Sequence, residues 1–267
     1  MILAYALALV VGLSLGLLGG GGSIITVPIL VYVIGMTPKL AVASSLVVVG
    51  STSLIGSISH FRAGNLELKT GAIFGSIAMV GAYLSAKTIA PMIPGAFQLI
   101  MFATIMLMAS IFMLKGRKVI ETNQENKELP VVQLLIFGSI VGIVTGLVGV
   151  GGGFLIVPAL HLLAKVPMKK AVGTSLLIIA ANSFSGYLGY ISQVQLDWSF
   201  MLFFIAFTAL GILLGSWLVK FIPAENLKKA FGVFLIFMGI YILYKERSRL
   251  MTTYQEIKNE QQLEIYA

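Results

Sequence analysis

The chain has 267 residues, of which 58% are hydrophobic and only 10% are charged, and its formal net charge is +8. In soluble domains roughly a quarter of the residues are charged, so this composition excludes an ordinary soluble protein. Most basic residues flank apolar runs, where they orient membrane spans, and this argues against a nucleic-acid partner. The absence of cysteine excludes a disulfide framework and thiol chemistry.

Uncharged apolar runs follow one another along the whole chain. A helix needs about 20 residues to cross about 30 Å of hydrocarbon. The runs are continuous rather than alternating, so helices fit them better than barrel strands. The sequence therefore predicts an all-α, polytopic membrane bundle. The runs cover residues 1–38, 40–59, 70–86, 88–114, 132–160, 171–196, 198–219 and 230–244.

A glycine cluster interrupts the first run at residues 19–22, and Pro28 follows it. Successive glycines permit positive φ and let the backbone unwind, so we expect two short helices, 2–18 and 23–36, that enter the membrane and return. A helix that restarts at the cluster presents free N–H groups and a partial positive charge to an anion. No Gly-Lys-Ser/Thr follows the cluster, so a nucleotide site is not expected.

The next apolar helix begins near Lys39 and carries hydroxyls in its first two turns, at Ser44 and Ser45. Two hydroxyls and the amides of a helix start are a suitable cage for an oxyanion. Lys39 is expected either to attract the anion or to anchor the helix at the interface. Deeper in the helix, Ser51 and Thr52 are expected either to line the site or to bond neighbouring helices.

The second half of the chain repeats these features 130 positions later, without a gap over more than fifty residues. Chance similarity would not keep a lysine and a hydroxyl pair in register with the glycines. Paired halves with corresponding breaks are typical of secondary transporters. The matched pairs are Gly19 and Gly149, Gly21 and Gly151, Gly22 and Gly152, Pro28 and Pro158, Lys39 and Lys169, Ser44 and Thr174, and Ser45 and Ser175.

The repeat predicts a first membrane unit at residues 1–114, a polar loop at 115–131, a second unit at 132–244 and a polar tail at 245–267, read as an interfacial or solvated helix. If each break forms a hairpin, three spans follow in each half, and the second unit is inverted. Lysines and arginines then divide twelve to six between the two sides, against ten to eight for a parallel repeat. The positive-inside rule favours the inverted arrangement.

Other ionisable residues give weaker signals. No carboxylate lies deep in an apolar run, so strong coupling to protons or sodium is not indicated, and a cation carrier is disfavoured. His60 and His161 are not repeat partners, and each is expected at an interfacial span end rather than in a metal site. Glu67 and Asp197 are expected in solvated turns. The spans hold no convergent acid, base or metal ligands, so we expect neither an enzyme nor a cofactor.

The chain resembles the TauE/SafE family of sulfite-exporter-like membrane proteins. The resemblance is carried by Gly-Leu-Leu-Gly-Gly-Gly-Gly-Ser with Val-Pro at 16–28 and its repeat at 146–158. It extends to Lys-x-Ala-Val-x-Ser-Ser at 39–45 and Lys-Lys-Ala-Val-Gly-Thr-Ser at 169–175. It covers essentially the whole chain, and it implies transport of sulfur-containing oxyanions or small organosulfonates across the cytoplasmic membrane.

The residues and the resemblance together give one hypothesis, an alternating-access exporter of a sulfite- or sulfoacetate-type anion. Export of a monovalent anion is favoured by about 2.3 kcal/mol per 100 mV. An anion channel and a carrier of another small organic anion stay open, as does the choice between monomer and homodimer. The expected partners are a small anion and membrane lipid, with Lys39 and Lys169 attracting the anion. The expected substrate-binding residues are Gly19, Gly20, Gly21, Gly22, Ser23, Ser44, Ser45, Gly149, Gly151, Gly152, Gly153, Thr174 and Ser175.

Overall fold

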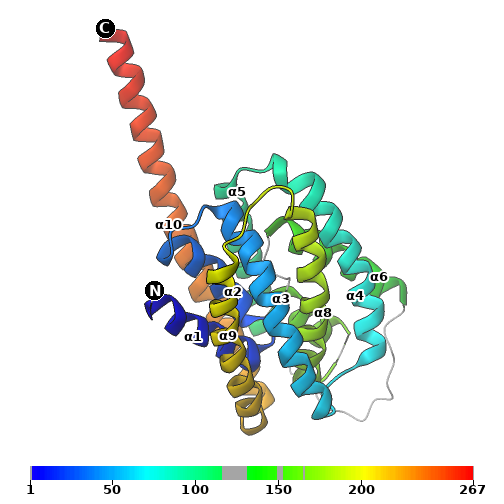
Figure 1. The fold of residues 1–267 in the computed structure, drawn as a ribbon. Helices are drawn as coiled ribbons and strands as arrows, with labels where there is room; N and C mark the ends of the chain where they lie inside the picture. The colour runs from blue at the N-terminus through cyan, green and yellow to red at the C-terminus, as the bar shows by residue number, and fades with distance from the viewer. Residues whose placement is uncertain (1, 116–130, 149–152, 165, 267) are drawn as a thin grey trace.

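The computed structural model describes residues 2–115, 131–148, 153–164 and 166–266. Within these ranges every regular element is a helix (Figure 1), which confirms the predicted all-α class. Among the described residues, five segments are long and apolar enough to cross a membrane, so this is a multi-pass membrane protein. These segments are Pro38–Arg62, Leu68–Met92, Met168–Tyr190, Trp198–Phe221 and Glu225–Arg247.

The first half begins with two short helices and continues with three long ones. Of the predicted loop 115–131, residues 116–130 lie outside the described ranges, and its end residues Lys115 and Val131 belong to helices. The elements are α1 (Ile2–Leu18), α2 (Gly21–Pro28), the π-helical turn η1 (Ile29–Val33), α3 (Pro38–Arg62), α4 (Leu68–Leu84), the π-helical turn η2 (Ser85–Ile89), the 3₁₀ turn η3 (Ala90–Met92) and α5 (Gly95–Lys115).

The second half has nearly the same order of elements, without a counterpart of η2. Its last helix continues through the predicted tail and extends beyond the other helices in Figure 1. The elements are α6 (Val131–Val148), α7 (Gly153–Pro158), the π-helical turn η4 (Ala159–Leu163), α8 (Met168–Tyr190), α9 (Trp198–Leu218), the 3₁₀ turn η5 (Val219–Phe221) and α10 (Ala224–Tyr266).

Proline ends the α-helical part of each short second helix. Pro28 and Pro158 have no N–H to donate to the carbonyl four residues earlier, so the regular ladder cannot continue through them. A π-helical turn follows each proline, with the N–H of Ile34 bonded to Ile29 O and the N–H of Ala164 bonded to Ala159 O, both at 3.0 Å. The expected single helix 23–36 is therefore two elements, and it starts at residue 21.

The first helix of each half packs against a helix of the other half. Gly12 and Gly16 of α1 lie against the backbone of α9, where a methyl group on Gly16 would be 2.8 Å from Gly215 Cα. Gly142 of α6 lies in the same way against Ala78 of α4. These glycines have the spacing expected of a small-residue packing face, and the contacts confirm that use. In both pairs the two helices run in parallel.

The centre of the bundle is the crossing of α3 and α8, which lie side by side in Figure 1. The apolar stretches of α3 and α8 are 78% and 72% buried, against 33–41% for those of the other spans. A methyl group on Gly50 would be 3.1 Å from Ser183 Cβ, and one on Gly56 would be 3.2 Å from Leu176 Cδ1. The later residue of α3 contacts the earlier residue of α8, so the two helices are antiparallel.

Candidate functional site

The first break consists of two residues rather than four. Gly19 closes α1 with φ +71°, and its N–H donates to Leu15 O at 2.8 Å. This left-handed cap requires glycine. Gly20 is the non-helical cap of α2, but Gly21 and Gly22 are already helical. The expectation that all four glycines unwind is therefore wrong, because Gly22 serves close packing of α2 on α1, against Leu15.

The first break meets the start of α7 and the central helix α8. A methyl group on Gly19 would be 2.8 Å from Ser175 Oγ and 3.0 Å from Val172 Cα. One on Gly153, the first residue of α7, would be 2.7 Å from Gly20 Cα and 2.6 Å from Ile179 Cδ1. The structure thus brings together predicted site residues from both halves, at a place where no side chain fits.

Some predicted residues cannot be placed in this way. Gly149, Gly151 and Gly152 lie outside the described residues, and so does the side chain of Ser23, whose backbone belongs to α2. The role of these four residues in binding stays a prediction.

Four predicted site residues with hydroxyl groups are at most 1% exposed: Ser44, Ser45, Thr174 and Ser175. Ser45 donates to Val42 O and Ser175 donates to Val172 O, each at 2.8 Å and each within its own helix. Their protons therefore point at helix carbonyls, and each hydroxyl must rotate before it can donate to an anion. The sequence places these residues beside the breaks, but it does not reveal this competition.

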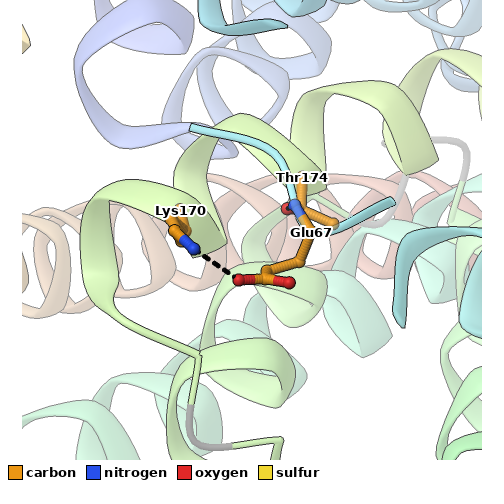
Figure 2. A network of polar contacts seen from close by, with 3 residues as sticks. All are labelled: Glu67, Lys170 and Thr174. Atoms are coloured by element: carbon orange, nitrogen blue, oxygen red, sulfur yellow. Dashed lines mark hydrogen bonds and ion pairs between the residues drawn. The ribbon is translucent and has the colours of Figure 1, made fainter. Parts of the chain in front are cut away.

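Thr174 takes part in a polar network that links α8 to the loop before α4 (Figure 2). The N–H of Glu67 donates to Thr174 Oγ1 at 2.8 Å, and the Glu67 carboxylate pairs with Lys170 Nζ at 2.6 Å. Glu67 is thus not the freely solvated residue that was expected. Its repeat partner Asp197 instead caps α9 by accepting from the N–H of Phe200 at 3.1 Å. The two halves therefore differ at these matched positions.

The two lysines expected to attract the anion lie at the starts of α3 and α8. Lys39 Nζ donates to Pro91 O at 3.1 Å, and Lys169 Nζ is 3.5 Å from Lys220 O. Each lysine thus reaches a carbonyl at the end of a neighbouring long helix. These contacts agree with the anchoring alternative, while attraction of an anion stays a prediction.

A polar clamp holds the end of α6, just before the second break. Tyr190 OH donates to Gly146 O at 3.1 Å, and Gln98 Nε2 donates to Leu147 O at 3.1 Å. These bonds satisfy carbonyls that have no partner inside a helix that ends there. This clamp could not be predicted from the sequence, because the three helices involved are far apart along the chain.

Both histidines lie in the last turn of their helical elements, as expected of span ends, and both are buried against neighbouring helices. His60 is 2% exposed, and neither ring nitrogen has a hydrogen-bond partner among the described residues. His161 is 8% exposed, and its Nδ1 is 3.0 Å from Val166 O. Burial cannot be read from one sequence, since it depends on which helices pack around a span end.

Further neutral polar groups lie on α3 and α8. Thr52 and Thr208 of α9 are hydrogen bonded to each other at 2.7 Å, as one of the expectations for Thr52 required. The position matching Thr208 in the first half holds Ala78, and Asn182, which matches Thr52, has no partner for its side-chain amide among the described residues.

Glu246 of α10 is 1% exposed and accepts a hydrogen bond from Tyr32 at 2.8 Å.

Comparisons with known proteins agree with this architecture. The family model described as "Sulfite exporter TauE/SafE" matches residues 4–242. A "Probable membrane transporter protein" of Xylella fastidiosa is 34% identical over 248 residues, which is 90% of this chain and 94% of that protein. The "Probable membrane transporter protein YdhB" of Bacillus subtilis is 26% identical over 239 residues, 87% of this chain and 96% of that protein. No solved structure matches the chain. The protein belongs to the TauE/SafE family of membrane transporters.

Proposed function

We propose that this protein is a secondary carrier that exports a small sulfur-containing oxyanion or organosulfonate by alternating access. The observation that carries the proposal is the meeting of the first break with the start of α7, where Gly153 lies against Gly20 before α2. Broken helices that meet inside a bundle bring free N–H groups to one place, and secondary transporters bind their substrates at such places. The site combines these N–H groups with the hydroxyls of Ser175 and Thr174.

An inverted repeat supports alternating access, because two opposite halves can exchange roles across the membrane. Matched helices pack against each other in antiparallel fashion at two places. One is the crossing of α3 and α8. The other is the packing of α5 on α10, where methyl groups on Gly232 and Gly239 would be 2.7 Å from Leu114 and 2.8 Å from Leu107. Both pairs agree with a second half that is inverted relative to the first.

The chemistry beside the breaks favours an anion. The buried side chains that face Gly19 and Gly153 are hydroxyl or aliphatic. Helix N-termini and hydroxyls both offer hydrogen-bond donors to oxyanion oxygens. Sulfite and sulfonates present three such oxygens, and the family description names a sulfite exporter. The related proteins are named only as transporters, so the substrate class is our proposal.

A flux assay in proteoliposomes tests the proposal. Purified protein is reconstituted, and uptake of labelled sulfoacetate, methanesulfonate and sulfite is compared with uptake of sulfate and acetate. We expect saturable uptake of a sulfite or sulfonate, and we expect it to be accelerated when the same anion is loaded inside. A rate that rises linearly with concentration, without such counterflow, would indicate a channel. Absence of flux for all these anions contradicts the proposal.

Two alanine variants test whether the meeting of the breaks is used. A methyl group on Gly153 would press against Gly20, whereas one on Gly75 of α4 would be in ordinary contact with Ile178 at 3.5 Å. We expect Gly153→Ala to lose most of the flux and Gly75→Ala to keep it, at equal amounts of folded protein. Equal flux in both variants would show that the junction of the breaks is not the transport site.

A further inference from the structure

His60 is a buried base with unused hydrogen-bonding capacity. It lies in the last turn of α3, is 2% exposed, and has no hydrogen-bond partner for Nδ1 or Nε2 among the described residues. Buried polar groups are nearly always hydrogen bonded, and an unpaired one costs about 1–3 kcal/mol. Such a group in a transporter calls for a functional explanation.

The repeat shows what the other half does with the matched position. Tyr190 lies 130 positions after His60, and its hydroxyl holds the end of α6 through Gly146 O. That position is therefore committed to structure in the second half. His60 makes no such bond in the first half, so its ring nitrogens remain available to a ligand.

His60 packs on the segment of α8 that carries Thr174, one of the residues of the proposed site. A methyl group on Gly173 would be 3.1 Å from His60 Cβ, so His60 packs on the first turns of α8. Thr174 follows Gly173 and accepts a hydrogen bond from the N–H of Glu67, whereas Ser175, which contacts Gly19, lies on the opposite face of α8 from Gly173. His60 thus lies at the end of the bundle where the first break meets α8.

The charges at this end favour an anion beside His60. Lys169 is bonded to the Lys220 carbonyl, and Lys170 of α8 is paired with Glu67 of the loop before α4. The C-terminal end of α3 itself favours a cation. A buried imidazolium still needs a counter-ion, and the carboxylate of Glu67 is engaged by Lys170.

We propose that His60 is a direct ligand of the transported anion and that it takes up a proton as the anion binds. The inference rests on the proposed function and adds a residue and a protonation step to the same site. The imidazole nitrogen accepts a proton from solvent and donates it in a hydrogen bond to an anion oxygen. When the anion leaves, the proton returns to solvent, and no covalent bond is made or broken. Binding and protonation favour each other, as linked equilibria must.

Calorimetry in buffers of different ionisation enthalpy measures this proton directly. The probe is methanesulfonate, which stays ionised throughout the neutral range, so any proton taken up belongs to the protein. We expect the wild-type protein to take up as much as about one proton per anion near neutral pH. We expect His60→Gln to take up none and to bind about ten- to a hundredfold more weakly, the loss of one hydrogen bond to a charged group.

His161→Gln is the matched control, because it removes the other buried histidine, whose Nδ1 faces Val166 O. We expect its proton uptake and affinity to equal those of the wild type. His60→Tyr provides a second variant that places the residue of the other half at this position, and it is also expected to take up no proton. A merely structural His60 would change stability without changing the proton count.

The possible failures are distinguishable. Binding of methanesulfonate by the wild type without proton uptake overturns the inference and leaves the proposed function standing. Unchanged proton uptake in a folded His60 variant does the same. If the wild type binds neither methanesulfonate nor sulfoacetate nor sulfite, the proposed function fails and the inference fails with it.

Discussion

Gly19 of α1 lies directly against Ser175 of α8, so that even a methyl group on the glycine would come within 2.8 Å of the serine Oγ. Gly19 also has φ +71°, a conformation that other residues adopt only at a cost. Conformation and contact thus select glycine independently at this position. The end of the first broken helix is held against the central helix of the other half.

Replacement of Gly19 by alanine separates these two reasons. Gly35 has φ +84° but no neighbour within 4 Å of an added methyl group, so Gly35→Ala reports the conformational cost alone, about 1–2 kcal/mol. We expect Gly19→Ala to lower the free energy of unfolding by a further 1–3 kcal/mol, roughly the cost of overpacking. Thermal unfolding in detergent compares the two variants. Equal losses would mean that the contact with Ser175 relaxes freely.

Removal of the Tyr190 hydroxyl tests the clamp on α6. Tyr190→Phe leaves the Gly146 carbonyl without this donor, and we expect a loss of about 1–3 kcal/mol in stability. Tyr187→Phe is the control, since the Tyr187 ring packs edge-on against Trp198 at 6.5 Å and should keep that contact. We expect the control to stay within about 0.5 kcal/mol of the wild type. A control as unstable as Tyr190→Phe would remove the argument for the clamp.

The ion pair between Glu67 and Lys170 should contribute little to stability despite its short distance. Its side chains are 38% and 42% exposed, and exposed pairs contribute about 0.2–1 kcal/mol. A double-mutant cycle of Glu67→Gln and Lys170→Met should give a coupling energy in that range, and it should shrink in high salt. The more exposed pair of Glu225 and Lys229 should give about 0.3–0.5 kcal/mol. A coupling energy above about 2 kcal/mol would contradict this assignment.

The bond between Thr52 and Thr208 predicts a non-additive pair. Each side chain is 0% exposed, so Thr208→Val leaves the Thr52 hydroxyl without its partner and should cost about 1–3 kcal/mol. The double variant Thr52→Val, Thr208→Val removes both partners and should cost clearly less than the sum of the single changes. Unfolding of the three variants measures this. Simple additivity would show that the two hydroxyls act independently.

The sequence predicted the helical class and the first break because each leaves a local pattern. Gly19, for example, begins a run that a continuous helix would avoid. The π-helical turn after Pro28 could only be anticipated as a bend, since the rearranged ladder depends on the packing around it. The helical state of Gly21 and Gly22 was missed because glycine is permissive rather than disruptive.

The candidate site was harder to predict from the sequence. The position of Ser175 beside the first break follows from the fold, but its hydrogen bond to Val172 O depends on the rotamer that its helix permits. The burial of His60 and the pairing of Glu67 with Lys170 depend on contacts between residues that are distant along the chain. One sequence without relatives carries little information about such contacts.

The packing of α1 on α9, and of α6 on α4, bears on how the protein is made. When the ribosome has completed the first half, α1 still lacks the helix whose backbone its glycines contact, and about 100 further residues must be added after Lys115 before α9 is complete at Leu218. Without that close contact, little holds one helix to another within lipid. Neither half is then a finished folding unit, and assembly of the bundle awaits synthesis of nearly the whole chain.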